Sequence, residues 1–381
     1  MAQNAYVTFY GEGKLLPGYQ NFDNLEMYLK RREALYRHVG LVPLLCRNRR
    51  ILEFGPGAGF NSVFTACLGP SYYELVEGDH ASLETLSQLM SEYSKSNTEY
   101  KIIEGLIENH FSEGTFDLVI CEATIPMQEN PEAILKKVSQ FVAPGGILLI
   151  TVCDEMSYLP EILRRLVANT IAHSSDSFEE KAASLLPYFG PHLETIEEMS
   201  RPHKHYIIDN YLQPLAGRRL FGMGQAIELL HGEFDFYACS PHFSVDWRWY
   251  KEIYEDSGRY NDLALDNYYS NLHNLMDYRI DHRIGSKDSN RSALKFAGEV
   301  YNKVVEMEDL GPNNSLIEPV LDDVLKISGM LPECAELSAR SLLDFIRAYK
   351  QISRGNKDIE WGQFSSFYGH SQQFVTFLRR V

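Results

Sequence analysis

The sequence predicts an α/β protein built on a doubly wound parallel sheet. Strand-like and helix-like segments alternate between residues 50 and 152, the order typical of such a sheet. A glycine-rich turn directly follows the first of these strands. Residues 147–152 are nearly all apolar, as expected for a strand covered by helices on both faces.

The first predicted strand, residues 51–54, ends in a tight turn. Gly55, Gly57 and Gly59 lie in this turn, and a helix should follow it. Only glycine takes positive φ freely, and its missing Cβ lets a ligand approach the backbone closely. The helix N-terminus presents unpaired N–H groups above the turn. The sequence therefore predicts a nucleotide- or nucleoside-binding crevice at the carboxyl end of a parallel strand.

Glu53 precedes the glycines, where its carboxylate can pair with a cationic amino group. The pattern E-x-G-x-G-x-G resembles the first motif of class I S-adenosylmethionine-dependent methyltransferases, which have a Rossmann-like core. It does not fit the GxGxxG spacing usual in NAD enzymes. The resemblance implies that Glu53 faces the methionine amino group and that the turn contacts the cofactor. The turn residues implied are Gly55, Pro56, Gly57, Gly59 and Asn61.

Residues 73–77 read as the second strand, and a helix should run from beyond Asp79 to Met90. Glu77 ends this strand about twenty residues after the glycines, where a carboxylate can accept hydrogen bonds from both ribose hydroxyls. Glu77 and the adjacent Gly78 are therefore predicted to bind the cofactor, with Asp79 as the rival acid. The alternative is an acid that caps a helix or is only solvated.

Residues 101–105 read as the third strand. In the family that the chain resembles, an acid soon after this strand often meets the adenine amino group. Leu106 replaces that acid here. The prediction is that backbone groups contact the adenine and that Leu106 and Ile107 pack against it.

Residues 115–121 read as the fourth strand, followed by a helix over 131–141 and a fifth strand over 147–152. FDLVICEA and NPEAILKKVSQFVAPGGILLITV resemble the later motifs of the same class, and the resemblance covers residues 45–155. It implies that Glu122 borders the methionine moiety or the acceptor pocket. Alternatively, Glu122 is a solvated acid that steadies the following turn.

Beyond the fifth strand, helices are predicted over 157–173, 177–186 and 192–199. The next segment, 201–214, concentrates polar and titratable residues. His203, His205 and Tyr206 are the catalytic candidates, since histidine titrates near neutral pH and can deprotonate an acceptor. The alternative is a pair of surface or loop-stabilising histidines. No second cluster with metal-ligand spacing is visible, so no metal is predicted.

The C-terminal half reads as a strand over 234–239, four helical stretches and a strand near the C-terminus. The helical stretches are 260–276, 292–308, 318–328 and 336–351. Class I methyltransferases end their sheet with a hairpin whose last strand is antiparallel. The resemblance therefore implies a mostly parallel seven-stranded sheet with helices on both faces. A large, mainly helical section would separate the sixth strand from the seventh, near 373–380.

An N-terminal helix is predicted from Asp23 to near Gly40, with Tyr19 and Tyr28 as weak site candidates. The chain is divided provisionally into six segments. These are an N-terminal helical cap (1–45), the cofactor-binding core (46–155), a helical lid or acceptor-pocket segment (156–220), the sixth-strand region (221–245), a helical insertion (246–370) and the final strand (371–381).

Composition limits the partners. The chain has 381 residues and a formal net charge of −16, which argues against a nucleic acid bound through its phosphates. No apolar run approaches the roughly 20 residues of a membrane span. The N-terminus lacks a secretory signal pattern. The 6 cysteines are scattered without a CxxC pair, which favours buried thiols in a reducing cytoplasm.

The predicted function is methyl transfer from S-adenosyl-L-methionine, with S-adenosyl-L-homocysteine as product. The acceptor is expected to be a small or medium-sized molecule, methylated on oxygen or nitrogen, and a homodimer is possible. One alternative is a protein or lipid acceptor that docks on the helical section. Another is a non-catalytic scaffold that keeps a cofactor-binding fold. A nicotinamide-dependent oxidoreductase is disfavoured by the glycine spacing.

Overall fold

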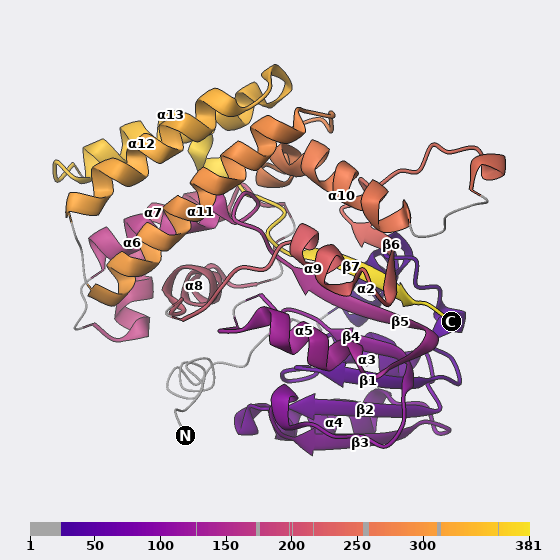
Figure 1. The fold of residues 1–381 in the computed structure, drawn as a ribbon. Helices are drawn as coiled ribbons and strands as arrows, with labels where there is room; N and C mark the ends of the chain where they lie inside the picture. Colours follow the sequence, from indigo (N-terminus) through magenta and orange to yellow (C-terminus); the bar gives the residue numbers. More distant parts are fainter. Residues whose placement is uncertain are drawn as a thin grey trace. The chain divides into compact units, whose positions relative to one another are not determined.

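The computed structural model describes residues 24–126, 128–172, 176–197, 199, 201–215, 217–253, 259–310, 314–356 and 358–381. Tyr19 and the start of the helix predicted from Asp23 lie outside these residues. The chain forms two compact units, each made of separate stretches of sequence (Figure 1). The first unit comprises Met1–Cys153, Gly217–Asn267 and Gln372–Val381, and the second comprises Asp154–Ala216 and Tyr268–Ser371.

The first unit contains one seven-stranded sheet with the order β3-β2-β1-β4-β5-β7-β6. β1 to β5 are parallel to one another, whereas β7 is antiparallel to both β5 and β6. The predicted fold class is thus confirmed. The strands are β1 (Arg50–Phe54), β2 (Tyr72–Glu77), β3 (Glu99–Glu104), β4 (Phe116–Cys121), β5 (Val142–Val152), β6 (Phe234–Ser240) and β7 (Gln373–Arg379).

Helices cover both faces of this sheet (Figure 1). Tyr36, Phe64 and Leu86 pack on one face, in a cluster with strand residues such as Ile51 and Leu75. These side chains come from three helices, α2 (Leu25–His38), α3 (Ser62–Cys67) and α4 (Leu83–Tyr93). α5 (Pro131–Ser139) and α9 (Met223–Leu230) pack together and lie on the other face.

Local sequence sets where these helices begin. Asn24 is the N-cap of α2, and its side chain accepts a hydrogen bond from the Met27 N–H at 3.0 Å. Asn130 caps α5 through the Ala133 N–H, also at 3.0 Å, and Pro131 follows at the first helical position. Both arrangements satisfy N–H groups that a helix start leaves without an internal partner.

The last two strands of the sheet are far apart in the sequence. β7 lies between β5 and β6, so Val375 pairs with Ile150 on one side and with Cys239 on the other. Helices of both units lie between β6 and β7 in the chain, as predicted. β7 is therefore an interior strand of the first unit even though it ends the sequence.

The second unit is helical. α11 packs against α6 and α12, and α12 packs against α13. Their buried faces are lined by aliphatic and aromatic side chains, among them Leu163, Val304, Val324 and Phe345. Its helices are α6 (Leu159–Ile171), α7 (Phe178–Leu193), α8 (His203–Ile207), α11 (Lys287–Leu310), α12 (Asn314–Met330) and α13 (Glu336–Ile352), and α10 (Arg259–Asn271) runs from the first unit into the second.

One predicted boundary is wrong. The helices expected over 177–186 and 192–199 are not separate, because α7 continues through Pro187 and Pro191 to Leu193. Proline removes a backbone donor and usually ends a helix. Here the apolar face continues past Pro187, since Leu185, Phe189 and Leu193 are all fully buried. Burial of that face stabilises the helix beyond the point at which local propensity would end it.

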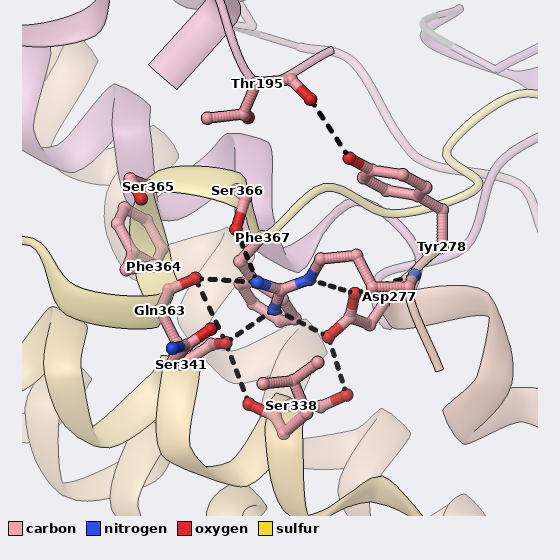
Figure 2. Close-up of polar contacts among 12 residues, drawn as sticks. Thr195, Asp277, Tyr278, Ser338, Ser341, Gln363, Phe364, Ser365, Ser366 and Phe367 are labelled. Carbon is pink, nitrogen blue, oxygen red and sulfur yellow. Dashed lines mark hydrogen bonds and ion pairs between the residues drawn. The ribbon is translucent and has the colours of Figure 1, made fainter. Parts of the chain in front are cut away.

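A buried ion pair joins separate segments of the second unit (Figure 2). The Asp277 carboxylate, 1% exposed, accepts two hydrogen bonds from the Arg279 guanidinium, at 2.8 and 2.9 Å. Arg279 also donates to the Ser341 hydroxyl, and the Ser338 hydroxyl donates to Asp277. Every charged group in this network has partners, so its role is to hold α13 to the loop after α10.

Among the described residues, no helix is both long and apolar enough to cross a bilayer.

Candidate functional site

The site is built at the carboxyl ends of β1, β2 and β4 in the first unit. These strands are parallel neighbours, and Glu53 on β1 is paired in register with Leu75 on β2 and Ile120 on β4. The segments that leave these strands therefore meet at one edge of the sheet. This edge is the usual ligand position in open α/β sheets.

Glu77, at the end of β2, is bound to the glycine turn. One carboxylate oxygen accepts the Gly57 N–H at 2.6 Å, and the other accepts the Asp79 N–H at 2.7 Å. Burial raises the pKa of Glu77, and these backbone N–H groups oppose the rise. The carboxylate is thus fixed beside the turn, and each oxygen retains capacity for another donor.

The neighbouring Asp79 has a different role. Its side chain accepts the Ala81 N–H at 3.2 Å and the Ser82 hydroxyl at 2.7 Å. It is the N-cap of the short 3-10 helix His80–Ser82. Asp79 and Glu77 are the two acids predicted as possible ribose ligands. The carboxylate of Asp79 is used to cap this 3-10 helix.

The glycine turn excludes other residues in two ways: its backbone angles would strain them, and it leaves no space for a side chain. Gly55, Gly57 and Gly59 have φ values of 67°, 57° and 86°. A Cβ on Gly55 would lie 2.4 Å from the Thr124 hydroxyl, and one on Gly59 would lie 2.5 Å from a Leu86 methyl group. No side chain fits at either position, so the backbone itself forms this surface.

Glu53 is buried, with 3% of its surface exposed. The Tyr73 hydroxyl donates to its carboxylate. Burial raises the pKa of Glu53 to about 7, and the nearby Glu122 carboxylate adds to the rise. A cation placed beside Glu53 would favour the ionised form of its carboxyl and so lower this raised pKa.

Glu122, just after β4, forms a buried ion pair with Arg32 of α2. The guanidinium donates to both carboxylate oxygens, at 3.0 and 2.7 Å. Asn61 also approaches Glu122, at 3.5 Å, and accepts the Tyr28 hydroxyl at 2.6 Å. Burial opposes the charge of Arg32, but Glu122 outweighs it and the Arg32 pKa is raised. α2 is thereby held against the glycine turn and the end of β4.

Arg32 is a site residue that the sequence interpretation missed. It lies 90 residues before Glu122, and no local motif connects them. A weaker signal was present, since Arg32 lies four residues after Tyr28 and four before Tyr36, on the apolar stripe of the helix. A charged residue on a buried stripe requires a partner.

The segment expected to meet the adenine follows β3. Leu106 is 41% exposed and Ile107 is buried. A Leu106 methyl group would lie 3.1 Å from a Cβ on Gly78, so the two residues are close. The backbone also connects them, because the Gly105 N–H donates to the Glu77 carbonyl at 2.9 Å. Leu106, Ile107 and Gly78 thus gather at the end of β2 and β3.

The three catalytic candidates lie in the second unit. His203, His205 and Tyr206 are on the short helix α8, and all three are partly buried. Because the segment is helical, side chains two residues apart point in different directions. The Tyr206 ring contacts that of Tyr211, with ring centroids 5.7 Å apart. Their catalytic role stays a prediction.

Within the described part of the chain, no group of three or more His, Cys, Asp or Glu residues is placed to hold a metal ion.

Comparison with known proteins agrees with this arrangement. Residues 28–201 match a family described as a methyltransferase domain. A comparison with curated proteins found no match. The strand order and the family match confirm the predicted fold, which is that of class I methyltransferases. The cofactor of this class is S-adenosylmethionine.

Solved methyltransferase structures are similar to this chain, although distant. The N-methyltransferase NodS from Bradyrhizobium japonicum WM9, in complex with S-adenosyl-L-homocysteine, is 17% identical with a TM-score of 0.32. That match covers 40% of this chain and 75% of NodS. PKMT2 from Rickettsia typhi, in complex with AdoHcy, is 18% identical with a TM-score of 0.38, over 61% of this chain and 49% of PKMT2. CcbJ from Streptomyces caelestis is 19% identical with a TM-score of 0.28, over 33% of this chain and 50% of CcbJ.

The described residues fit S-adenosylmethionine. The turn at Gly55 and Gly59 leaves no room for a Cβ, so the backbone is the available surface for a nucleoside. The Glu77 carboxylate suits a pair of ribose hydroxyls, and the Glu53 and Glu122 carboxylates suit an ammonium group.

Proposed function

We propose that this protein is an S-adenosylmethionine-dependent methyltransferase that acts on a small or medium-sized acceptor, at oxygen or nitrogen. The observation that supports this most directly is the carboxylate of Glu77, held at 2.6 Å by the N–H of Gly57. This bond joins the turn that would receive the nucleoside to the acid that would receive its ribose. The bound cofactor supplies an electrophilic methyl group on a sulfonium.

Glu77 would hold the ribose, since both of its oxygens are oriented by backbone N–H groups and can each accept a further bond. The adenine would pack against Gly78, Leu106 and Ile107. Leu106 stands where the family often has an acid, so this surface is apolar.

Glu53 and Glu122 would receive the ammonium group of the methionine moiety. Arg32 would receive its carboxylate, because the Arg32 Nε atom is buried without a hydrogen-bond partner among the described residues. Asn61 and Tyr28 would hold Glu122 in a fixed position beside the glycine turn. Gly55, Pro56, Gly57 and Gly59 would form the surface beneath the cofactor.

His203, His205 or Tyr206 would take the proton of the acceptor. Lys204, between the two histidines, is paired with Glu179, which fixes one side of the helix. Because α8 is helical, one histidine rather than both is expected to face an acceptor. A histidine base typically contributes about 10²–10⁴ in rate.

The cofactor assignment is tested by Gly57→Val. Valine is strained at a φ of 57°, and it would displace the N–H that holds Glu77. S-adenosylhomocysteine binding, measured by calorimetry, should weaken about a thousandfold, which corresponds to about 4 kcal/mol. Gly232→Val is the matched control, because a Cβ there meets open space. Unchanged affinity in folded Gly57→Val protein would contradict the assignment.

The acceptor is tested separately. Cell extract incubated with the enzyme and S-adenosylmethionine should contain a molecule about 14 daltons heavier, the mass that a methylation adds. The Gly57→Val protein should not produce it. If only protein or lipid is methylated in this assay, the proposal of a small-molecule acceptor is wrong, and the acceptor is a protein or a lipid.

A further inference from the structure

The turn after β4 contains a residue in a backbone conformation that its side chain disfavours. Ala123 has a φ of 53°, in the left-handed region. Among the described residues other than glycine, only Asn48 also has a positive φ, and asparagine adopts this region more readily than alanine does. Ala123 is exposed, so burial of its methyl group does not compensate for the strain. Another part of the structure must hold this conformation.

The hydroxyl of Thr151, on β5, holds the turn. Backbone pairing between β4 and β5 ends at Cys121 and Ile150. Beyond that point, the Ala123 N–H donates a hydrogen bond to the Thr151 hydroxyl oxygen at 2.5 Å. Thr151 is 1% exposed, so the packed sheet fixes its side chain. A side chain thus anchors the turn where the pairing of the two strands stops.

The turn positions groups on both sides of Ala123. Glu122, directly before it, binds both terminal nitrogens of Arg32 through its carboxylate. Thr124, directly after it, donates to the Glu122 carbonyl at 2.9 Å and closes the turn. The Thr124 hydroxyl also lies against Gly55, since a Cβ there would approach it to 2.4 Å. The conformation of Ala123 therefore sets the position of the Glu122–Arg32 pair and of the side chain packed on the glycine turn.

The strand order places this turn on one side of the site. β1 lies between β4 and β2, and β3 lies beyond β2. The acids proposed for the methionine moiety, Glu53 and Glu122, lie at the ends of β1 and β4. Glu77 and Leu106, proposed for the ribose and the adenine, lie at the ends of β2 and β3. A change in the turn after β4 should therefore affect recognition of the methionine moiety and spare recognition of the adenosine.

We propose that Thr151 is a positioning residue for the methionine moiety of the cofactor. Its hydroxyl keeps Ala123 in the left-handed conformation. This conformation keeps Glu122 and Arg32 where the ammonium and carboxylate groups of the cofactor would bind. The inference rests on the proposed function, because it concerns the same cofactor site. Thr151 acts through the turn and is not proposed to touch the cofactor.

Thr151→Val tests this role, because valine is close to threonine in shape and lacks the hydroxyl acceptor. Two probes are titrated by calorimetry. One is S-adenosylhomocysteine, and the other is methylthioadenosine, an adenosine thioether without the amino and carboxylate groups. The affinity of the variant for S-adenosylhomocysteine should fall at least about tenfold, and that for methylthioadenosine should stay within about twofold of wild type. A general loosening of the fold would weaken both probes together.

Ala123→Gly provides a rescue. Glycine adopts a positive φ without strain, so the turn would no longer require the Thr151 hydroxyl. The double variant Thr151→Val with Ala123→Gly should recover an affinity for S-adenosylhomocysteine within about threefold of wild type. Thr151→Ser keeps the hydroxyl and should also stay within about threefold.

Thr376→Val is the matched control. Thr376 is a fully buried threonine of β7, and its hydroxyl donates to the Val39 carbonyl at 2.8 Å. The variant removes a buried hydroxyl from the same sheet and should leave the ratio of the two affinities within about twofold of wild type. If Thr151→Val does not fold, Ala123→Val replaces it, because a β-branched residue is strongly disfavoured at this φ and the position is exposed. The same selective loss is expected.

Equal weakening of both probes in Thr151→Val, unchanged affinity for S-adenosylhomocysteine, or failure of Ala123→Gly to restore it would overturn the inference and leave the proposed function intact. A selective loss as large in Thr376→Val or in Thr151→Ser would also overturn it. If methylthioadenosine binds too weakly for calorimetry, the rescue by Ala123→Gly decides. Failure of the wild-type protein to bind S-adenosylhomocysteine would contradict the proposed function, and the inference with it.

Discussion

Glu77 and Asp79 lie two residues apart, and their carboxylates have different partners. Glu77 binds the N–H of Gly57 in the turn, whereas Asp79 caps the following 3-10 helix. We predict that Glu77→Ala weakens S-adenosylhomocysteine binding by roughly 2–3 kcal/mol, or about 30- to 150-fold, because charge-assisted hydrogen bonds are the stronger ones. Calorimetry measures this directly.

Asp79→Ala is the control for that prediction. It should lower the free energy of unfolding by about 1 kcal/mol, as loss of an N-cap does, and change the affinity no more than about threefold. A larger affinity loss in Asp79→Ala than in Glu77→Ala would show that Asp79 is the ribose ligand.

Glu53 predicts a dependence of stability on pH. Its folded-state pKa of about 7 lies above the ordinary value of 4.5, so the folded protein holds this proton after the unfolded chain has lost it. The contribution of Glu53 to stability is therefore complete below pH 4.5 and falls as the pH rises to 7. The difference in free energy of unfolding between wild type and Glu53→Gln should fall by about 1–3 kcal/mol across this range, since one pKa unit corresponds to about 1.4 kcal/mol.

Urea unfolding of both proteins at several pH values tests this dependence. Glutamine keeps an acceptor for the Tyr73 hydroxyl but does not titrate, so it isolates the ionisation of Glu53. A difference between the two proteins that stays constant from pH 4.5 to 7, or rises, would contradict the raised pKa.

At the scale of single residues, the sequence located acids by their position after strands. Glu53 is the last residue but one of β1, Glu77 ends β2 and Glu122 directly follows β4, so all three lie at the carboxyl edge of the sheet. Arg32 could not be found in this way, because its pairing with Glu122 arises only when α2 packs on the sheet. Its place on the apolar stripe of the helix indicates that it needs a partner, but nothing in the sequence identifies that partner as Glu122.

At the scale of elements, β7 is required for the sheet although it lies near the C-terminus. It is hydrogen-bonded on both edges, to β5 and β6, and Val375 and Thr376 are fully buried. We predict that deletion of residues 372–381 gives insoluble or unfolded protein, because β5 and β6 would both lose their shared neighbour. Solubility on expression and circular dichroism measure the outcome.

Deletion of Val381 alone is the matched control, since this residue lies beyond β7 and is exposed. It should behave as wild type. A soluble protein that lacks 372–381 and still binds S-adenosylhomocysteine would contradict the structural role of β7.

The elements themselves were predicted unequally. The apolar run of β5 and the glycine turn are local signals, and they sufficed for the sheet. The predicted end of α7, at residue 186, was wrong. Pro187 is a strong local signal for the end of a helix, but the burial of Phe189 and Leu193 in the tertiary structure overrides it. The pairing of β6 with β7 could be predicted only by resemblance, because nothing near either strand in the sequence identifies the other.

At the scale of the whole molecule, the first unit contains a complete sheet and all of the residues proposed to bind the cofactor. The second unit has its own buried core in α6, α7 and α11–α13. A unit with its own core can in principle fold alone. We predict that the first unit still binds S-adenosylhomocysteine when residues 154–216 and 268–371 are each replaced by a flexible Gly/Ser linker.

The affinity of this excised protein should lie within about fivefold of wild type, a difference of about 1 kcal/mol. The linker protein keeps both β6 and β7, whereas deletion of residues 372–381 removes β7. The linker protein should therefore fold and bind S-adenosylhomocysteine, and the deletion protein should not. The same excised protein carrying Glu77→Ala is the control for specific binding, and it should lose affinity as the full-length variant does. An excised protein that aggregates, or that unfolds cooperatively but does not bind, would show that cofactor binding requires the second unit as well as the acidic edge of the sheet.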